Sequence, residues 1–414
     1  MILDISGISS DALKALPFVS VVSVLFNRNF AGLLIANTIL GVAFPVQLIL
    51  GGLAGLMLAP SPNLATVPAS IQTLAGMIAA APFSLLMGRM GRRAGFTLGG
   101  LMTLTGAVIA TQALYFQNFI LLCMAHFLMG AGWAAFQYFR FAASEAVDRD
   151  WRPVAISLML SSLLIAAVAG PQVFIVAKDV LTPIPFAGAY VATGVIAVLG
   201  LIPLIVVRMP QPERRLKREP SGRLSALTVL RRPAIRHAVG IAALSQGVMV
   251  FLMIPTPIAM VGCGFSEETA SDVVRWHIVA MFAPSFFTGF LIKRFGASSV
   301  AITGLVIMIA AAGAAGLGLS ATHFYGALIV LGVGWNLGFI GATAMLDAAL
   351  SEEEKPAVQG ANDTIIAFGS TICAFAAGFI VSSLGWVVLA MISGGGLVLA
   401  LAMLFVDRAR LSKI

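Results

Sequence analysis

The sequence predicts an all-α membrane protein in which twelve transmembrane helices form two pseudo-symmetric six-helix bundles. Three observations predict this fold: the composition, the length of the apolar runs and an internal repeat. Of the 414 residues, 59% are hydrophobic and only 10% are charged, whereas soluble domains are about 45–50% apolar and about 25% charged. A soluble surface needs more charge than this chain carries, so we expect lipid to cover much of it.

Each apolar run is long enough for a membrane-crossing helix, which needs about 20 residues. The runs are continuous rather than alternating, which excludes an outer-membrane barrel. They lie at 30–58, 66–88, 95–115, 119–142, 154–177, 185–207, 237–261, 271–292, 297–318, 323–346, 358–382 and 385–406. We expect a lead-in at 1–29, a first bundle at 30–207, a linker at 208–236, a second bundle at 237–406 and a tail at 407–414.

The linker at 208–236 carries nine Lys/Arg and two Glu, so it holds +7 of the chain's net charge of +8. Between two apolar regions, such a segment is typical of a cytoplasmic loop beside anionic lipid rather than of a nucleic-acid site. With both termini in the cytoplasm, all 25 Lys/Arg except Lys178 and Arg275 lie on or near the cytoplasmic side. The sequence therefore predicts a multi-pass protein of the inner (cell) membrane with both termini cytoplasmic.

An internal repeat relates the two halves. The run GAGW at 130–133 recurs as GVGW at 332–335, an offset of 202 residues, and RMG at 89–91 recurs as RFG at 294–296, an offset of 205. Glu145 recurs as Asp347, again with the offset of 202. Order, spacing and chemistry recur together, which predicts two bundles of the same topology.

Three short motifs resemble those of the major facilitator superfamily of secondary transporters. SxxxGRxGRR at 84–93 and GxxxKRxG at 289–296 resemble the family's GxxxDRxGRR loop, and HxxxGxG at 126–132 resembles its RxxxGxG motif. Both loops lack the family's Asp, which argues against its usual gating pair. Further runs, at 276–289 and 332–363, are similar to a proteobacterial branch with riboflavin-importer-like members. The resemblance implies the twelve-helix fold, alternating access and a cavity lined by spans 1, 4, 7 and 10.

Polar and aromatic residues on those cavity-lining spans form the candidate substrate-binding set. In hydrocarbon such groups are costly, so each needs a partner, a cavity or the interface. The set comprises Asn37, Gln47, Gln137, Tyr138, Arg140, Gln246, Trp335 and Asn336. The sequence leaves two interpretations of Arg140 open: it snorkels to the interface, or it is a cavity cation for a carbonyl-bearing or anionic substrate. Pro45 and Pro257 predict kinks in spans 1 and 7.

Three titratable residues inside the spans are candidates for proton coupling: His126, His277 and Asp363. A membrane His titrates near neutral pH, but it equally serves as a structural hydrogen-bond partner between helices. Asp363 lies near the start of span 11, where a helix N-terminus also welcomes a carboxylate for dipole reasons. For each of the three residues, the sequence leaves proton coupling and a structural role open.

Charged residues at the predicted cytoplasmic ends form a candidate gate. We expect the acidic residues at the ends of spans 4 and 10 to pair with arginines of the neighbouring loops. These residues are Arg89, Arg92, Arg93, Glu145, Arg294 and Asp347.

The predicted function is secondary active transport, with proton-coupled uptake of a neutral or weakly charged nutrient, such as an aromatic vitamin, as the preferred reading. Efflux of drugs or metabolites by proton antiport is the alternative, and a non-transporting scaffold is a third. No GxxxxGK[ST] loop is present for ATP-driven transport. We expect no enzyme activity, no cofactor and no metal site. The expected partners are a small-molecule substrate, the lipid bilayer and protons, without nucleic acid, and we expect a monomer.

Overall fold

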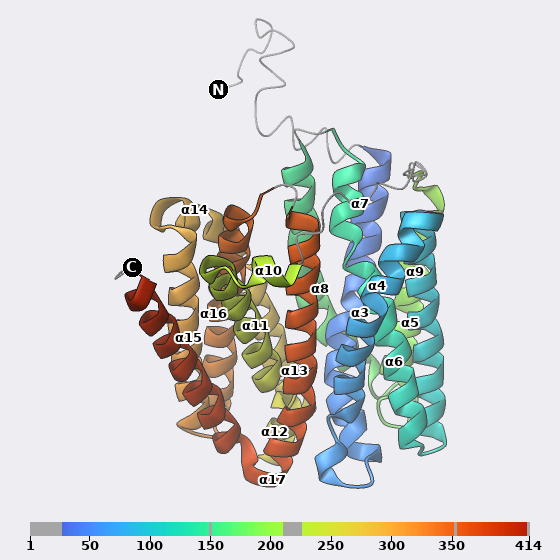
Figure 1. Cartoon of the computed structure of the whole chain (residues 1–414). Coiled ribbons are helices and arrows are strands. Elements are labelled where there is room, and N and C mark those ends of the chain that lie inside the picture. Colours follow the sequence, from blue (N-terminus) through green and yellow to red (C-terminus); the bar gives the residue numbers. More distant parts are fainter. Residues whose placement is uncertain (1–26, 149–150, 210–225, 352–353, 412–414) are drawn as a thin grey trace, which may run out of the picture.

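The computed structural model describes residues 27–148, 151–209, 226–351 and 354–411, and every regular element among them is helical (Figure 1). The first half contains α3 (Arg28–Leu58), the short 3-10 helix η1 (Pro62–Leu64), α4 (Val67–Met90), α5 (Arg92–Tyr115), α6 (Phe119–Phe136), α7 (Phe139–Glu145), α8 (Arg152–Ala177) and α9 (Ala187–Val206). The second half contains α10 (Ala226–Leu230), α11 (Pro233–Met253), α12 (Thr256–Gly262), α13 (Glu267–Phe282), α14 (Ser285–Phe295), α15 (Ala297–Gly316), α16 (Ala321–Ala349) and α17 (Lys355–Leu411).

The helices of the described residues supply the predicted membrane crossings. Ten segments are long and apolar enough to cross a membrane, and one of them, Val358–Val406, is divided at Gly385, where φ is +83°. The apolar part of α8, Ser161–Ala177, is shorter. Counting α8 and the two parts of α17, the structure contains twelve spans, which confirms the predicted fold class. Residues 1–26 of the predicted lead-in, 210–225 of the linker and 412–414 of the tail lie outside the described ranges.

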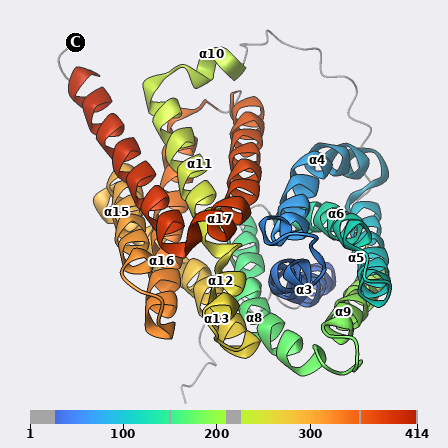
Figure 2. The same cartoon turned by 90° about the horizontal axis from the view of Figure 1, so that it is seen from below.

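Helices α3–α9 form one bundle and α11–α17 form the other, as the view along the helices shows (Figure 2). In the first bundle, α5 packs against α6 and α9, and α4 packs against α6. In the second, α15 packs against α16 and α17, and α13 packs against α16. Because these pairs correspond under the sequence repeat, the two bundles have the same topology.

The arginine-bearing turns of the repeated loop motif distinguish one end of the molecule from the other. The turns at 88–93 and 293–297 lie at the end drawn uppermost in Figure 1, which we call the basic end. The turns at 59–66 and 263–266 lie at the opposite end, which we call the far end.

The repeated loop motif makes the same sharp turn in both bundles. Gly91 joins α4 to α5 with φ of 87°, and Gly296 joins α14 to α15 with φ of 84°. A side chain disfavours this left-handed region, so glycine is required at both turns. The turn of the motif is therefore kept although its Asp is absent.

The repeated GxG motif brings two helices of each bundle into backbone contact. A Cβ on Gly130 of α6 would meet the backbone carbonyl of Gln72 on α4, and a Cβ on Gly332 of α16 would lie 2.7 Å from the carbonyl oxygen of His277 on α13. Small residues allow such close approach of membrane helices. The repeat therefore encodes the packing inside each bundle.

Three of the spans are broken along their length. Span 4 changes from α6 to α7 at Gln137–Tyr138, span 7 from α11 to α12 at Pro255, and span 8 from α13 to α14 at Pro284. The predicted kink in span 7 thus falls two residues before Pro257. Span 1, by contrast, continues as one helix through Pro45.

Candidate functional site

The two bundles meet at the far end through a cluster of charges. Nζ of Lys178, at the end of α8, lies 2.9 Å from carboxylate oxygens of Glu267 and of Glu268 on α13, and 3.1 Å from Asp179. Burial works to lower the pKa of Lys178, but hydrogen bonds to the three carboxylates outweigh it and raise the pKa above its ordinary range. We call this cluster the far-end latch, because two of its three ion pairs join the bundles.

A second polar contact joins α8 to α13 deeper in the same interface. Arg275 pairs with Asp272 at 2.7 Å on its own helix, and Tyr325 of α16 donates to the same carboxylate at 2.7 Å. With its amide oxygen turned towards Arg275, Gln172 of α8 accepts from Nη2 at 2.5 Å and from Nη1 at 3.3 Å. Thus Lys178 and Arg275, which the sequence placed apart from the other cations, both bind across the bundle interface.

Further contacts close the far half between α17 and the segments η1 and α4. Oγ of Ser383 donates to Oδ1 of Asn63 at 3.4 Å, and Oγ1 of Thr371 lies 4.0 Å from the sulfur of Met77. The element pairs that join the bundles include α8 with α13, α4 with α17, and α3 with α12. These contacts hold the far end shut.

A polar and aromatic cavity of about 40 Å³ lies towards the basic end. Its lining is Asn37 on α3, Trp133, Phe136, Gln137 and Arg140 on span 4, and Met159 and Leu163 on α8. Gln137 and Arg140 are exposed, because they follow the break between α6 and α7. Three residues of the predicted substrate-binding set, Asn37, Gln137 and Arg140, therefore lie together.

Asp363 of the second bundle is within electrostatic reach of Arg140, one of the residues that line this cavity. The guanidinium of Arg140 is the positive charge that acts on its carboxylate. The side chain is exposed, and its Oδ1 accepts one hydrogen bond, from Nδ2 of Asn362 at 3.2 Å. The structure thus brings together Arg140 and Asp363, which the sequence assigned to different roles.

The two tryptophans related by the repeat carry stacked aromatic rings. Trp133 stacks on Phe44 of α3 with centroids 4.3 Å apart, and Trp335 stacks on Phe339 at 5.1 Å. Nε1 of Trp335 donates to Oε1 of Gln246 at 2.8 Å. Trp133 is only partly buried and borders the cavity, whereas Trp335 is 8% exposed. Gln246 and Trp335 therefore lie together but largely inside the second bundle.

Other members of the predicted substrate set are engaged within their own bundle. Asn336 donates to the carbonyl of Met281 at 2.6 Å and to Ser285 at 2.7 Å, on either side of the break between α13 and α14. Tyr138 donates to the carbonyl of Ala80 at 3.0 Å. Such bonds satisfy backbone groups beside a helix break, so these residues position helices.

Gln47 and His126 belong to a chain of four buried side chains in the first bundle. Gln72 donates to Gln47 at 3.0 Å, His126 Nδ1 lies 2.8 Å from Oε1 of Gln72, and His126 Nε2 lies 2.8 Å from the hydroxyl of Tyr190. Because the Gln72 oxygen accepts, Nδ1 carries the proton and Nε2 accepts from Tyr190. Every hydrogen bond of the ring is made in the neutral form, which favours a structural role.

His277, the counterpart of Gln72 under the repeat, makes one hydrogen bond. Its Nδ1 lies 2.7 Å from the carbonyl oxygen of Leu328 on α16, and its Nε2 is buried without a partner. The two bundles therefore use corresponding positions to join span 2 to span 4 and span 8 to span 10.

The predicted gate residues lie at the basic end. Arg92 makes a two-pronged pair with Glu145, at 2.7 Å and 3.2 Å, but both residues belong to the first bundle. The pair therefore joins α5 to α7 rather than the two halves. The others, Arg89, Arg93, Arg294 and Asp347, are exposed at the same end.

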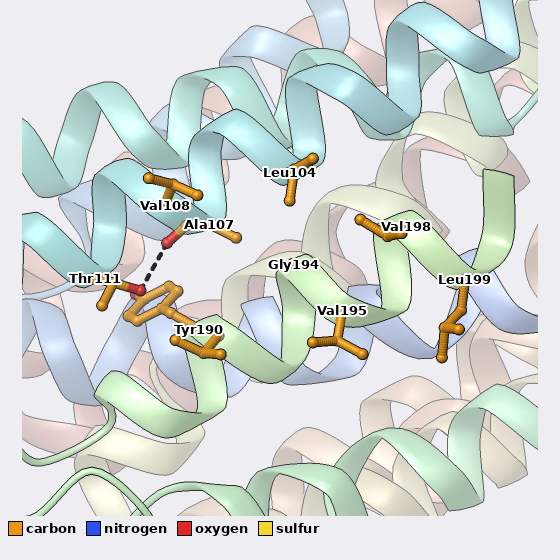
Figure 3. Close-up of a pocket in the computed structure, with 10 residues that line it drawn as sticks. Leu104, Ala107, Val108, Thr111, Tyr190, Gly194, Val195, Val198 and Leu199 are labelled. Carbon is orange, nitrogen blue, oxygen red and sulfur yellow. Dashed lines mark hydrogen bonds between the residues drawn. The ribbon is translucent and has the colours of Figure 1, made fainter.

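An apolar groove of about 300 Å³ lies between α5 and α9 (Figure 3). Its two hydroxyls point to internal partners: Thr111 donates to the carbonyl of Ala107, and Tyr190 binds His126. With no free polar group and with half-exposed valines along its rim, the groove is suited to lipid tails rather than to a polar substrate.

Sequence reasoning missed the partners of several residues. Tyr190 and Ser162, which accepts from Asn37 at 2.9 Å, are uncharged and give no pattern of their own, and Gln72 is marked only as the counterpart of His277 under the repeat. The far-end latch could have been predicted from the sequence. Lys178 is an isolated cation on the side of the membrane opposite most Lys/Arg, and Glu267-Glu268 precede span 8 on that same side.

Two six-helix bundles of the same topology define a twelve-helix membrane protein. Residues 238–413 match the profile of the Major Facilitator Superfamily. Riboflavin transporter RfnT of Brucella anthropi is 38% identical over 365 residues, which cover 87% of this chain and 90% of that protein. The uncharacterized MFS-type transporter YdeG of Bacillus subtilis is 28% identical over 387 residues, 89% of either chain.

Solved structures share the fold. The nucleoside transporter NupG matches with a TM-score of 0.72 and 12% identity over 91% of this chain and 99% of that one. FucP, in the outward conformation, matches with a TM-score of 0.60 and 18% identity over 91% and 97%. The chain belongs to the Major Facilitator Superfamily and is a multi-pass membrane transporter, which confirms the resemblance seen in its motifs.

Proposed function

We propose that this transporter imports riboflavin or a closely related flat, hydrogen-bonding vitamin across the bacterial inner membrane. The observation that carries the proposal is the cavity of Asn37, Trp133, Gln137 and Arg140, which combines an aromatic surface with amide and guanidinium donors. The 38% identity to a protein named a riboflavin transporter supports the same substrate. The working unit is a monomer, since one chain supplies both six-helix bundles.

Transport proceeds by alternating access. The structure is closed at the far end by the Lys178 cluster and by the contacts of α17 with η1 and α4. The excess of Lys/Arg at the basic end supports a cytoplasmic position for that end and for both termini. The structure then corresponds to the inward-facing state, and the latch must break for the far end to receive substrate.

Coupling to protons takes place at Asp363. Its carboxylate is acted on by the charge of Arg140 and accepts one described hydrogen bond, so gain and loss of a proton change its interactions. His126, in contrast, is held neutral by Gln72 and Tyr190, and a second proton would cost it the bond from Tyr190. The residues of the basic end, including the Arg92–Glu145 pair, shape the inner gate.

The experiment is uptake of radiolabelled riboflavin in a bacterial strain that requires riboflavin and lacks its own importer. We expect uptake above the empty-vector control, its collapse with a protonophore, and its loss in Arg140→Ala. The efflux alternative predicts the opposite: expression would lower accumulation of the label or raise resistance to toxic compounds. Import would be rejected in favour of efflux if the cells took up no flavin and expression either lowered accumulation of the label or raised resistance to toxic compounds.

A further inference from the structure

We infer that the groove between α5 and α9 binds one acyl chain of a phospholipid, and that this lipid belongs to the membrane leaflet at the far end. The inference concerns a site apart from the polar cavity and does not depend on which solute is transported. It is carried by the depth of the groove, by its width and by the absence of a free hydroxyl donor among its lining residues (Figure 3).

The groove opens towards lipid rather than towards the second bundle. Helices α5 and α9 lie on the side of the first bundle that is turned away from α11–α17 in both views (Figures 1 and 2). Each of the two helices is long and apolar enough to cross a membrane. Val108, Val191 and Val195 line the groove and are 53%, 44% and 51% exposed. Because these side chains lie within membrane-crossing segments, acyl chains are their neighbours.

The groove lies at the depth of one leaflet. Helix α5 ends at the far end with Tyr115, which is 65% exposed, and exposed tyrosines mark the membrane–water interface. Of the lining residues of α5, Thr111 is nearest to Tyr115 in the sequence and Leu104 is farthest from it. At 1.5 Å per residue the groove therefore covers depths of roughly 6 to 17 Å from that interface. One leaflet supplies about half of a hydrocarbon core that is about 30 Å thick, so this depth corresponds to the acyl chains of the leaflet at the far end.

The groove has the width of an acyl chain rather than of a helix. Its volume is about 300 Å³. Over the roughly 10 Å between Leu104 and Thr111, this volume corresponds to a cross-section of roughly 30 Å². An α-helix with its side chains is about 10–12 Å in diameter, which gives roughly 80–110 Å². A hydrocarbon chain, whose carbons contact their neighbours at about 3.5–4.0 Å, fits this space, whereas a helix of a second copy does not.

Small and stiff residues keep the groove open. A Cβ on Gly194 of α9 would lie 3.4 Å from Leu104 and 3.5 Å from Ala107 of α5, so a larger residue at position 194 would fill the space. The valines along the rim are β-branched, and valine strongly prefers one χ1 rotamer in a helix. The groove is therefore preformed and does not depend on a rearrangement of its walls.

The chemistry of the groove favours an acyl chain as its ligand. The hydroxyls of Thr111 and Tyr190 are already bonded to the carbonyl of Ala107 and to His126. An apolar cavity stays dry, so water does not fill the space. Lipid tails are as apolar as leucine, and van der Waals contact therefore provides the binding energy. A chain in the groove touches the walls of two helices, whereas a chain on a smooth helix face touches one.

The test is photo-crosslinking of the purified full chain in lipid nanodiscs. The nanodiscs contain phosphatidylethanolamine with a diazirine in its acyl chain, placed either near the carboxyl end or near the terminal methyl group. Labelled residues are then located by mass spectrometry of peptides. The comparison surface is the part of α15 around Gly313, which is exposed and corresponds to Val108 under the repeat offset of 205.

We expect the label to concentrate on the groove relative to α15. The diazirine near the carboxyl end should label the region of Thr111, and the one near the methyl group the region of Leu104, because the chain enters from the far end. Gly194→Leu fills the groove and should lower its labelling to the level of α15. Gly313→Leu, the same change at an open position of α15, should leave labelling of the groove unchanged.

Equal labelling of the groove and of α15 in the native chain would overturn the inference, since only bulk lipid would then surround the groove. Unchanged groove labelling in folded Gly194→Leu would do the same. A reversed order of the two diazirine positions would overturn the assignment to the far leaflet. Absence of lipid label together with a dimer in size-exclusion chromatography would make a second copy the occupant. Should Gly194→Leu fail to fold, the comparison of the groove with α15 in the native chain decides alone.

Discussion

The far-end latch leads to a quantitative prediction for Lys178→Ala. The change removes both ion pairs that cross between the bundles, to Glu267 and Glu268, whose side chains are 30% and 46% exposed. Exposed pairs are worth about 0.2–1 kcal/mol each, so the two pairs contribute roughly 0.4–2 kcal/mol to the closed far end. Since 1.4 kcal/mol is a factor of about ten in an equilibrium constant, the population open at the far end should rise by about 2- to 30-fold.

The assay is alkylation of a single cysteine at the closed interface. Thr66→Cys, in a chain whose native cysteines are replaced, places the thiol where Thr66 is 2% exposed against Gly378 of α17. If reagent reaches it only when the far end opens, the alkylation rate is proportional to the open population. Lys178→Ala should raise the rate by the factor given above, and Lys178→Arg should not.

Two controls separate gate opening from general loosening. Thr193→Cys, fully buried inside the first bundle, should react equally slowly with and without Lys178→Ala. Lys293→Ala, at the basic end, should leave the Thr66→Cys rate unchanged. The latch would be refuted by an unchanged Thr66→Cys rate in Lys178→Ala, or by equal acceleration at Thr193→Cys.

Three further predictions concern packing, charge and pH. Gly130→Ala places a Cβ against the α4 backbone and should lower the melting temperature by several degrees, whereas Gly88→Ala, with open space around it, should not. Equal shifts of the melting temperature of the two variants in differential scanning fluorimetry would contradict the close contact. Arg92→Ala removes the two-pronged pair with Glu145 and should slow uptake. Because both residues lie in one bundle, the Thr66→Cys alkylation rate should not change. A changed alkylation rate would mean that the pair acts on the far end. The raised pKa of Lys178 keeps the cation charged, and its stabilising effect is fully present below the ordinary value of 10.5 and is lost only as pH rises through the raised value. The alkylation rate, corrected for thiol ionisation, should therefore be flat from pH 7 to 9, and a rise over that interval would count against this account.

The fold was predictable because it depends on patterns that recur along the chain. Apolar runs set the spans, and the repeated glycines fix the turns at Gly91 and Gly296 and the contacts at Gly130 and Gly332. Backbone geometry of this kind is specified locally by residue type. The same reasoning could not place the break of span 7 at Pro255, because Pro255 and Pro257 lie only two residues apart.

The site was predictable only in part, because residue type does not say which way a membrane helix turns its side chains. Arg140 and Gln137 reach the cavity because a break follows α6, while Tyr138 between them binds the backbone of α4. Asn336 was expected beside substrate, but it bonds both sides of the break in span 8. Such roles depend on tertiary partners that a single sequence does not name.

Because α3 continues through Pro45, its two ends move together when the first bundle rotates. Its 31 residues form a rod about 46 Å long at 1.5 Å per residue. A rigid-body rotation of about 15°, the size seen in established subunit rotations, would move each end of a rod pivoting at its middle by about 6 Å in opposite directions. In the proposed alternating-access cycle, one rotation of that size would pull the far-end charges apart while the basic end moves in the opposite direction, so neither gate needs a mechanism of its own.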